Sequence, residues 1–364
     1  MGVLLFIVIL SVLIFVHEFG HFFVARRAGV AVEEFGFGFP PRLWGIQRGP
    51  TTYSLNWIPF GGFVRLQGEQ GEGDARPDSF VNHAASRQFM IIAAGVVMNL
   101  LLAWVLMSSV LTIGVASEQS MVPHDRFARY AKTYQQVLVS PASPTAKAGV
   151  ADGDHLLTIN GQHFSTTTEL ITYVQQQHYP ALDIRFLHAG ATREVAISPT
   201  SVNGQPRYGL GVETIGQVRY PWYVASWYGL NLSIRLGWQT LQGLGQVVVS
   251  FVRTGQVSAD VTGPVGIAVL TSQISQLGMV AILQFIALLS ISLAVVNFLP
   301  IPALDGGRAL FILLGRLRGR PINRQVENII HVAGFYLLLA LVILISIRDV
   351  RRFGLFQQLV HLWK

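Results

Sequence analysis

Four long apolar stretches constrain the fold of this chain more than any other feature. A helix of roughly 20 apolar residues is long enough to cross the hydrocarbon core of a bilayer. The stretches run from Met1 to about Ala25, from Phe89 to Ala116, from about Val280 to Leu299 and from about Ile329 to Ile347. Of the 364 residues, 51% are hydrophobic and only 12% are charged, which excludes an ordinary soluble protein. The sequence therefore predicts a polytopic α-helical membrane protein with about four transmembrane helices.

Composition also limits the chemistry that the chain can carry. It has no cysteine, so disulfides, thiolate zinc sites and a cysteine nucleophile are excluded, and His, Asp and Glu are the strong metal ligands that remain. The net charge of +7 does not indicate a nucleic-acid partner, because the basic residues lie at the ends of apolar segments and form no stripe with aromatic residues. Contacts with anionic membrane lipid explain them better.

The basic residues also indicate an orientation. Arg26 and Arg27 follow the first stretch, and four arginines lie between residues 316 and 324, between the third and fourth stretches. Because cytoplasmic loops are enriched in Lys and Arg, both places are expected in the cytoplasm and both termini outside. Three arginines between residues 348 and 352 would then be external, against the same bias. A cleaved signal peptide ending near Gly29–Ala31 is the alternative for the first stretch, but no basic residues precede its apolar run.

Between the second and third stretches, residues 117–215 predict a small external α+β domain. The expected elements are a helical turn near Pro144, a strand at 155–159, an Asn160-Gly161 hairpin turn, a helix at 168–177 and strands at 181–187 and 192–197. This order resembles a bacterial PDZ domain, which typically holds a peptide by adding it to a sheet edge. A spacer or sieve that binds no peptide is the alternative.

Within residues 216–260, residues 221–252 are apolar enough to suggest a fifth span. They are interrupted by Arg235 and several glutamines, and they are rich in Trp and Tyr, which favour membrane interfaces. This pattern favours amphipathic helices that lie on the outer surface. The predicted organisation is thus an N-terminal membrane part (1–116), the PDZ-like domain (117–215), these interfacial helices (216–260) and a C-terminal membrane part (261–364).

An H-E-x-x-H motif lies within the first apolar stretch. His17 and His21 are four residues apart, so a helix places both imidazoles on one face at a spacing suited to one zinc ion. Glu18 stands beside them, where it can take a proton from the attacking water. A charged side chain in the middle of a span costs roughly 2.5–3.5 kcal/mol on insertion scales. The motif therefore indicates a function, with a polar cluster that holds helices together as the structural alternative.

A catalytic zinc site usually has three protein ligands and one open position. The longer zincin pattern fails here, because Val24 and Arg27 occupy the places of its glycine and third histidine. The attractive remaining carboxylate is Asp305, in the sequence NFLPIPALDGG. Pro300 and Pro302 break the third span there, which predicts irregular backbone that is buried in protein or lines a watery cavity. Capping the following helix is the other role open to Asp305.

Residues 30–67 form short β-type runs separated by Gly and Pro. They are too apolar for a cytoplasmic loop and too short to span, which predicts a membrane-re-entrant β hairpin beside the zinc. A transmembrane substrate must unwind before it is cut, and an exposed strand edge can accept the unwound segment. Gly36, Phe37 and Gly38 are the candidate substrate contacts. A hairpin anchored on the membrane surface is the alternative.

Together these motifs resemble the site-2 protease family of intramembrane zinc metalloproteases, most closely the bacterial regulator-of-sigma-E protease type, over nearly the whole chain. The LDGG-type motif has an Asn, Asn297, eight residues before its Asp. The resemblance implies that His17, His21 and Asp305 bind one Zn²⁺, that Glu18 is the catalytic acid/base, and that Asn297 helps to hold the substrate backbone.

The same resemblance implies cleavage within or near the transmembrane segment of single-span proteins, such as anti-sigma factors or signal-peptide remnants. It also implies a bacterial inner-membrane location, with the PDZ-like domain periplasmic and the active site toward the cytoplasmic side. Two features depart from the family pattern. Only one PDZ-like domain is visible where the best-known members carry two, and the segment Gly95–Asn99 resembles the family's GPxxN motif without its proline. A functional role for Asn99 therefore stays open beside plain helix packing.

Two other functions compete with proteolysis. A zinc-stabilised membrane scaffold could bind single-span proteins through the PDZ-like domain without cutting them, but a structural zinc site would not require Glu18. A metal transporter would be expected to show polar residues in several spans and repeated halves, and neither is evident.

Overall fold

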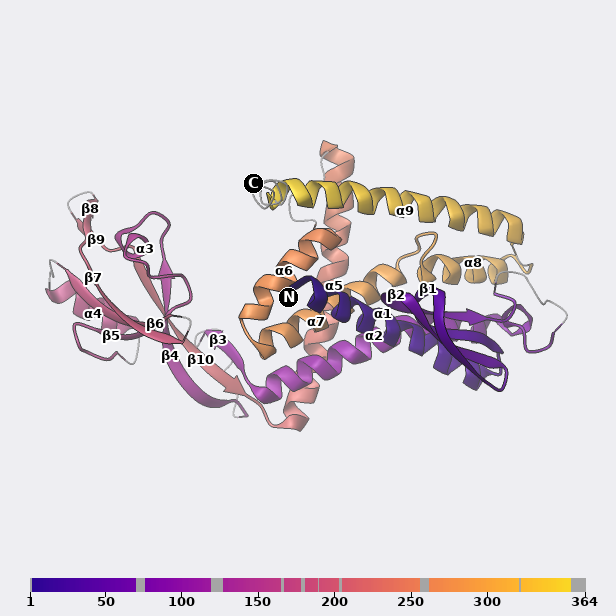
Figure 1. Ribbon diagram of the computed structural model, residues 1–364, viewed down its shortest axis with the longest axis horizontal. Helices are drawn as coiled ribbons and strands as arrows, with labels where there is room; N and C mark the ends of the chain where they lie inside the picture. The colour runs from indigo at the N-terminus through magenta and orange to yellow at the C-terminus, as the bar shows by residue number, and fades with distance from the viewer. Residues whose placement is uncertain are drawn as a thin grey trace. The chain divides into compact units, whose positions relative to one another are not determined.

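The computed structural model describes residues 2–69, 76–118, 127–164, 167–177, 181–188, 190–202, 205–255, 262–320 and 322–354 (Figure 1). The chain divides into two compact units: residues 1–110 together with 226–364, called here the membrane unit, and residues 111–225, called the inserted unit. Parts of the predicted segments 117–215, 216–260 and 261–364 lie outside the described residues.

Four helices in the described part of the chain are long and apolar enough to cross a membrane. They are α1 (Gly2–Ala28), α2 (Ala85–Ile113), α7 (Met279–Phe298) and, over Gln325–Arg352, α9 (Arg324–Arg352). The prediction of about four transmembrane helices is confirmed at this level. Only 6% of the apolar window of α9 is buried inside the protein, so most of its apolar surface is left for contact with lipid.

Three further α-helices lie wholly or mainly in the described part of the membrane unit: α5 (Trp222–Thr254), α6 (Pro264–Gln276) and α8 (Asp305–Leu317). The segment predicted as several amphipathic helices contains instead the single 33-residue helix α5. Its glycines weaken a helix but do not end it, and no proline interrupts it. It is not among the four candidate spans found in the described residues. The third apolar region is divided at Gly278, whose φ of +95° ends α6 and precedes α7.

A long hairpin, β1 (Val32–Arg48) and β2 (Thr51–Leu66), follows α1 and packs along it through β2 (Figure 1). Its strands are antiparallel, but the register shifts repeatedly. From Glu34 to Phe37, every β1 residue has a partner in each half of β2. This part of β1 is therefore an inner strand. One outer edge is the last part of β2, and the other is the second half of β1, which pairs with the first half of β2.

An apolar core next to the hairpin fixes α1, β1 and α2 against one another. Phe22 and Phe35 stack in it with ring centroids 4.6 Å apart. The short 3-10 helix η1 (Phe80–Asn82) contributes Phe80 to this core. Its buried members are Phe22, Ala25, Val30, Val32, Phe35, Leu66, Phe80, Ile91 and Ile92. Because Phe22 and Ala25 follow directly on the H-E-x-x-H motif, this packing also sets where the motif points.

The inserted unit contains a six-stranded antiparallel sheet in the order β3-β10-β4-β5-β6-β7. The strands are β3 (Val115–Glu118), β4 (Arg129–Val139), β5 (His155–Ile159), β6 (Leu182–His188), β7 (Ala191–Ile197) and β10 (Leu210–Arg219). The helices are α3 (Pro144–Lys147) and α4 (Thr167–Gln177), and β8 (Thr200–Val202) pairs with β9 (Gln205–Arg207). The helical turn, helix and strands predicted between residues 140 and 197 are thus present. Asn160 and Gly161, with φ of +50° and +78°, form the predicted turn.

Both ends of the inserted unit meet. The backbone N–H of Tyr220 donates to the carbonyl of Leu111 over 3.0 Å. The unit also has an apolar core of its own, with Phe186, Ile184 and Leu182 fully buried between the sheet and α4. It is therefore a separately packed insertion between α2 and α5.

Candidate metal centre and catalytic cavity

Three side chains from opposite ends of the sequence converge in the membrane unit. His17 and His21 project from α1, and Asp305 is the first residue of α8. Asp305 Oδ2 lies 2.9 Å from His17 Nε2 and 3.3 Å from His21 Nε2, and the two Nε2 atoms are 3.3 Å apart. Both histidines are buried. Among the described residues, these three form the group of side chains suited to hold a metal ion.

Their spacing fits zinc. Nitrogen and oxygen ligands about 2.0–2.1 Å from a tetrahedral zinc ion lie about 3.3 Å from one another. Two of the three separations match this value, and the third, between Asp305 Oδ2 and His17 Nε2, is shorter at 2.9 Å. Two imidazole nitrogens and one carboxylate oxygen also supply three ligands, which leaves a fourth position for water or substrate, as in catalytic zinc sites. The donor set and its geometry therefore fit the predicted zinc ion.

The ring of His21 is held in the tautomer that a metal requires. Its Nδ1 lies 2.8 Å from the carbonyl oxygen of Ile91 in α2. A carbonyl can only accept, so Nδ1 donates its proton there and Nε2 is left with a free lone pair. The close approach of α2 depends on Gly95, because a Cβ atom at this position would collide with both imidazoles.

The segment between α7 and α8 places Asp305 next to the two histidines. It is irregular, as Pro300 and Pro302 predicted, and Ala303 adopts a φ of +76°. Side chains at Gly306 and Gly307 would collide with carbonyl groups of this turn, so both glycines are required for its tight packing. The alternative role of Asp305 as a helix cap is wrong: Leu304 occupies the N-cap position. Burial disfavours the ionised carboxyl, but hydrogen bonds to the histidines outweigh it and hold the pKa of Asp305 below its usual range.

Glu18 lies in a cavity of about 410 Å³ next to this group. His21 and Asp305 line the same cavity, together with the Gly62–Leu66 part of β2 and with Phe39 from β1. One carboxylate oxygen of Glu18 accepts the backbone N–H of Val64 over 3.1 Å. The hairpin thus orients the glutamate that the sequence singled out as acid/base.

The other predicted site residues lie around this centre. Asn297 is in the last turn of α7, with its Nδ2 3.3 Å from His17 Nε2, so it adjoins the ligand group. Gly36 and Phe37 lie in the inner part of β1, with strand partners on both sides. Asn56 donates to the carbonyl groups of Phe37 and Gly38 over 3.3 and 3.2 Å. The β2 residues that line the cavity were not singled out from the sequence, because nothing local distinguishes them from the rest of the hairpin.

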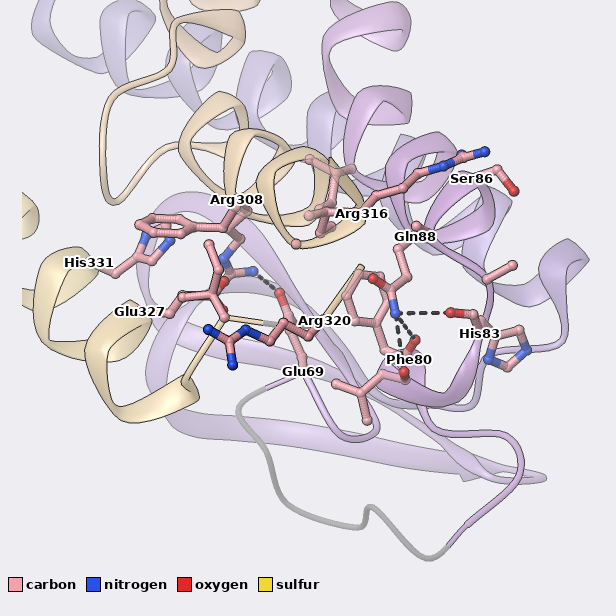
Figure 2. Close-up of a pocket in the computed structure, with 18 of the residues that line it drawn as sticks. Glu69, Phe80, His83, Ser86, Gln88, Arg308, Arg316, Arg320, Glu327 and His331 are labelled. Atoms are coloured by element: carbon pink, nitrogen blue, oxygen red, sulfur yellow. Dashed lines mark hydrogen bonds and ion pairs between the residues drawn. The ribbon is translucent and has the colours of Figure 1, made fainter. Parts of the chain in front are cut away.

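A second, more open pocket of about 640 Å³ adjoins the catalytic cavity, between the starts of α2 and α9 and the helix α8 (Figure 2). Glu69, Phe80, Ile92 and Arg308 line both spaces. Glu69 and Arg308 form an ion pair, which ties α8 to the chain just beyond β2. Sequence reasoning missed this pair. Its one local signal is Arg308 itself, three residues after Asp305 and directly before the apolar middle of the helix.

A group of side chains suited to hold a metal ion, with an adjacent glutamate and with both histidines on a helix long enough to cross a membrane, defines a membrane-embedded metallopeptidase. The chain belongs to peptidase family M50, whose family model matches residues 5–341. It is 31% identical over 362 residues to all3971 of Nostoc sp. (strain PCC 7120), which is named as a zinc metalloprotease, and the match covers 96% of each chain. It is 27% identical to the regulator of sigma-W protease RasP of Bacillus subtilis, over 96% of this chain and 98% of the relative. Zinc metalloprotease RasP of Bacillus licheniformis is 28% identical, over 96% and 99%. The protein is therefore an intramembrane zinc metalloprotease.

Proposed function

We propose that this protease cleaves single-span membrane proteins within or near their transmembrane segments, with His17, His21 and Asp305 as the zinc ligands and Glu18 as the acid/base. One observation carries the proposal: the three ligand atoms lie about 3 Å apart, two of them on α1, a helix apolar enough to cross a membrane. A centre on such a helix is suited to substrates that are themselves in the membrane.

Bound zinc supplies Lewis-acid polarisation of the scissile carbonyl and makes the attacking water more acidic. Glu18 accepts the water proton on its carboxylate and then donates it to the leaving nitrogen. The hydrogen bond from Val64 keeps one carboxylate oxygen fixed, so the other is directed at the reacting atoms. The side-chain amide of Asn297, next to His17, donates to a carbonyl of the bound substrate.

The substrate backbone binds along the last part of β2 rather than at Gly36–Gly38. The Val64 N–H points away from β1, toward Glu18, which supports an outer strand edge that faces the catalytic cavity. The cavity that Gly62 and the residues after it line leaves room for a peptide next to this edge. An unwound substrate segment pairs there by β-augmentation, which brings its peptide bonds next to Glu18. Gly36, Phe37 and Gly38 support this edge from behind.

The proposed setting follows the sequence. The hairpin is re-entrant, the inserted unit is a periplasmic PDZ-like domain that excludes bulky substrates or holds a peptide, and the active site lies toward the cytoplasmic side of a bacterial inner membrane. The strand and helix order of the inserted unit supports the PDZ-like assignment. The name of the Bacillus subtilis relative links that protein to sigma-W regulation, which supports anti-sigma factors as candidate substrates.

Reconstitution of the purified protein with a single-span substrate tests the proposal. Wild-type protein is expected to produce a new terminus inside the span, detected by mass spectrometry, and a zinc chelator is expected to abolish it. Glu18→Gln keeps the size of the side chain but removes the base, so cleavage should fall by about 10²–10⁴-fold while zinc content stays unchanged. Wild-type protein that binds zinc but leaves every span intact would favour the scaffold function. Cleavage by Glu18→Gln at the wild-type rate would exclude Glu18 as the acid/base.

A further inference from the structure

Asn99 in α2 lies directly behind His17. Its side chain is fully buried, and its Nδ2 is 3.3 Å from His17 Nδ1. Its backbone carbonyl accepts a hydrogen bond from the Ser290 hydroxyl of α7 over 2.8 Å. The side-chain oxygen of Asn99 has no hydrogen-bond partner among the described residues. Helix packing does not explain this side chain, because the contact with Ser290 uses only the backbone.

The tautomer of His17 indicates a role for the side chain of Asn99. His17 Nε2 faces Asp305, at 2.9 Å, and the Nε2 of His21, at 3.3 Å. Nε2 is therefore the nitrogen that ligates a metal, and the proton of the neutral ring lies on Nδ1. An Nδ1–H needs an acceptor, and an amide NH₂ group cannot serve as one.

Rotating the Asn99 side-chain amide by half a turn gives a partner both to its unpartnered oxygen and to the Nδ1–H of His17. The oxygen and nitrogen of a side-chain amide occupy nearly equivalent positions, and their assignment follows from the hydrogen bonds that they make. After the rotation, the unpartnered oxygen stands 3.3 Å from His17 Nδ1 and accepts its proton. His21 already has the equivalent acceptor in the carbonyl of Ile91.

We infer that Asn99 is a positioning residue for the metal centre: its side-chain oxygen accepts the Nδ1–H of His17, fixes the ring and keeps Nε2 free for zinc. The inference rests on the proposed role of His17 as a ligand. Acceptors behind metal-bound histidines fix the tautomer and raise the basicity of the ligand, and their loss typically costs roughly 10–100-fold in metal affinity or activity. Each histidine of the centre thus has its own acceptor in α2, one from the backbone and one from a side chain.

Two substitutions separate the acceptor from the volume of the side chain. Asn99→Leu keeps the size but has no acceptor, and Asn99→Asp keeps an oxygen that can only accept. Zinc affinity, measured in full-length protein by competition with a chelator, should fall roughly 10–100-fold in Asn99→Leu and stay within a few-fold of wild type in Asn99→Asp. Ser290→Ala, which removes only the contact to the Asn99 backbone, is the matched control and should keep wild-type affinity. Thermal unfolding of the zinc-free proteins shows whether each variant is folded.

The outcomes separate the inference from the proposed function. Wild-type affinity in folded Asn99→Leu would overturn the inference. So would equal losses in Asn99→Leu and Asn99→Asp, because only the first lacks an acceptor. In either case, loss of zinc in His17→Ala would leave the proposed metal centre intact. If His17→Ala instead binds zinc as tightly as wild type, the ligand role of His17 is wrong and the inference falls with it.

Discussion

A Cβ atom at Gly95 would collide with the imidazoles of both His17 and His21. Gly95 therefore does more than permit helix packing. The two imidazole rings occupy the space that a side chain at this position would fill. A similar contact occurs at Gly20, where a Cβ would meet the backbone of Ala94 and the side chain of Met98. At the residue scale, α1 and α2 approach closely because a glycine stands on each side of their contact.

Gly95→Ala should therefore displace the histidines without changing the ligands themselves. We expect zinc affinity to fall by roughly 10-fold or more, on the scale of changes that misorient a ligand, and proteolysis to fall with it. Zinc content after purification and chelator competition measure the effect. Gly243→Ala in α5 is the matched control, because a Cβ there meets no atom within 4 Å. It should leave zinc binding unchanged and stabilise the helix by about 0.5–1 kcal/mol. Normal zinc affinity in Gly95→Ala would contradict the close packing described here.

The sequence predicted some of these residues and not others, for a physical reason. His17, Glu18 and His21 follow from helical spacing alone, since residues four apart share a face. Asp305 could be proposed because prolines and glycines mark irregular backbone around a carboxylate within an apolar region. The position of Asn99 behind His17, and the pairing of Arg308 with Glu69, depend on which helices pack together. Helical spacing within one segment carries no such information.

At the scale of elements, the N-terminus of α6 is capped by a side chain from α9. Gly263 precedes α6 and has no side chain to cap it. Asp349, near the end of α9 and fully buried, instead accepts the backbone N–H groups of Gly263 and Gly266 over 2.9 and 2.8 Å. A carboxylate at a helix N-terminus satisfies donors that lack partners within the helix and interacts favourably with its dipole. Asp349 therefore fixes α6 to α9.

Asp349→Ala should destabilise the membrane unit, because it leaves two buried N–H groups without this acceptor, at about 1–3 kcal/mol for each. Asp349→Asn keeps an accepting oxygen and should lose less. Thermal unfolding in detergent measures both, and Arg351→Ala, at an exposed position in the same helix, is the control. Equal stability of Asp349→Ala and wild type would show that the two N–H groups find other partners. The zinc affinity of the folded variant should be unchanged, since Asp349 touches no ligand.

The elements themselves were largely predictable. Hydropathy predicted the four apolar helices. Turn residues and β-type runs predicted the strands and the Asn160-Gly161 turn of the inserted unit. The hairpin was predicted as short β-type runs, but its register was not. Which part of β1 becomes an inner strand depends on how β2 curls around it. The same limit applied to α5, where the sequence predicted amphipathic helices over 216–260 but not that Trp222–Thr254 form one continuous helix.

At the scale of the whole molecule, the inserted unit has its own apolar core, and its ends are joined by the hydrogen bond between Tyr220 and Leu111. A unit with these two properties can be removed without pulling the flanking helices apart. The ligand set lies wholly in the other unit.

Replacing residues 114–218 with a short Gly-Ser linker should therefore leave a folded membrane unit that binds zinc with wild-type affinity. Zinc content and thermal unfolding with and without zinc are the measurements. A linker of the same composition inserted at Gly161, in the hairpin turn of the intact chain, controls for the added sequence. Loss of zinc from the shortened protein alone would mean that the metal centre needs the inserted unit.

Asp305, the third proposed ligand, enters the chain 288 residues after His17. During synthesis, α1 with its glutamate and both imidazoles is complete long before the carboxylate that closes the set has been made. A nascent or prematurely ended chain that stops before α8 therefore carries the motif without the means to hold its metal. With Asp305 as a ligand, peptide-bond hydrolysis is expected to begin only once nearly all of the enzyme has been translated and inserted.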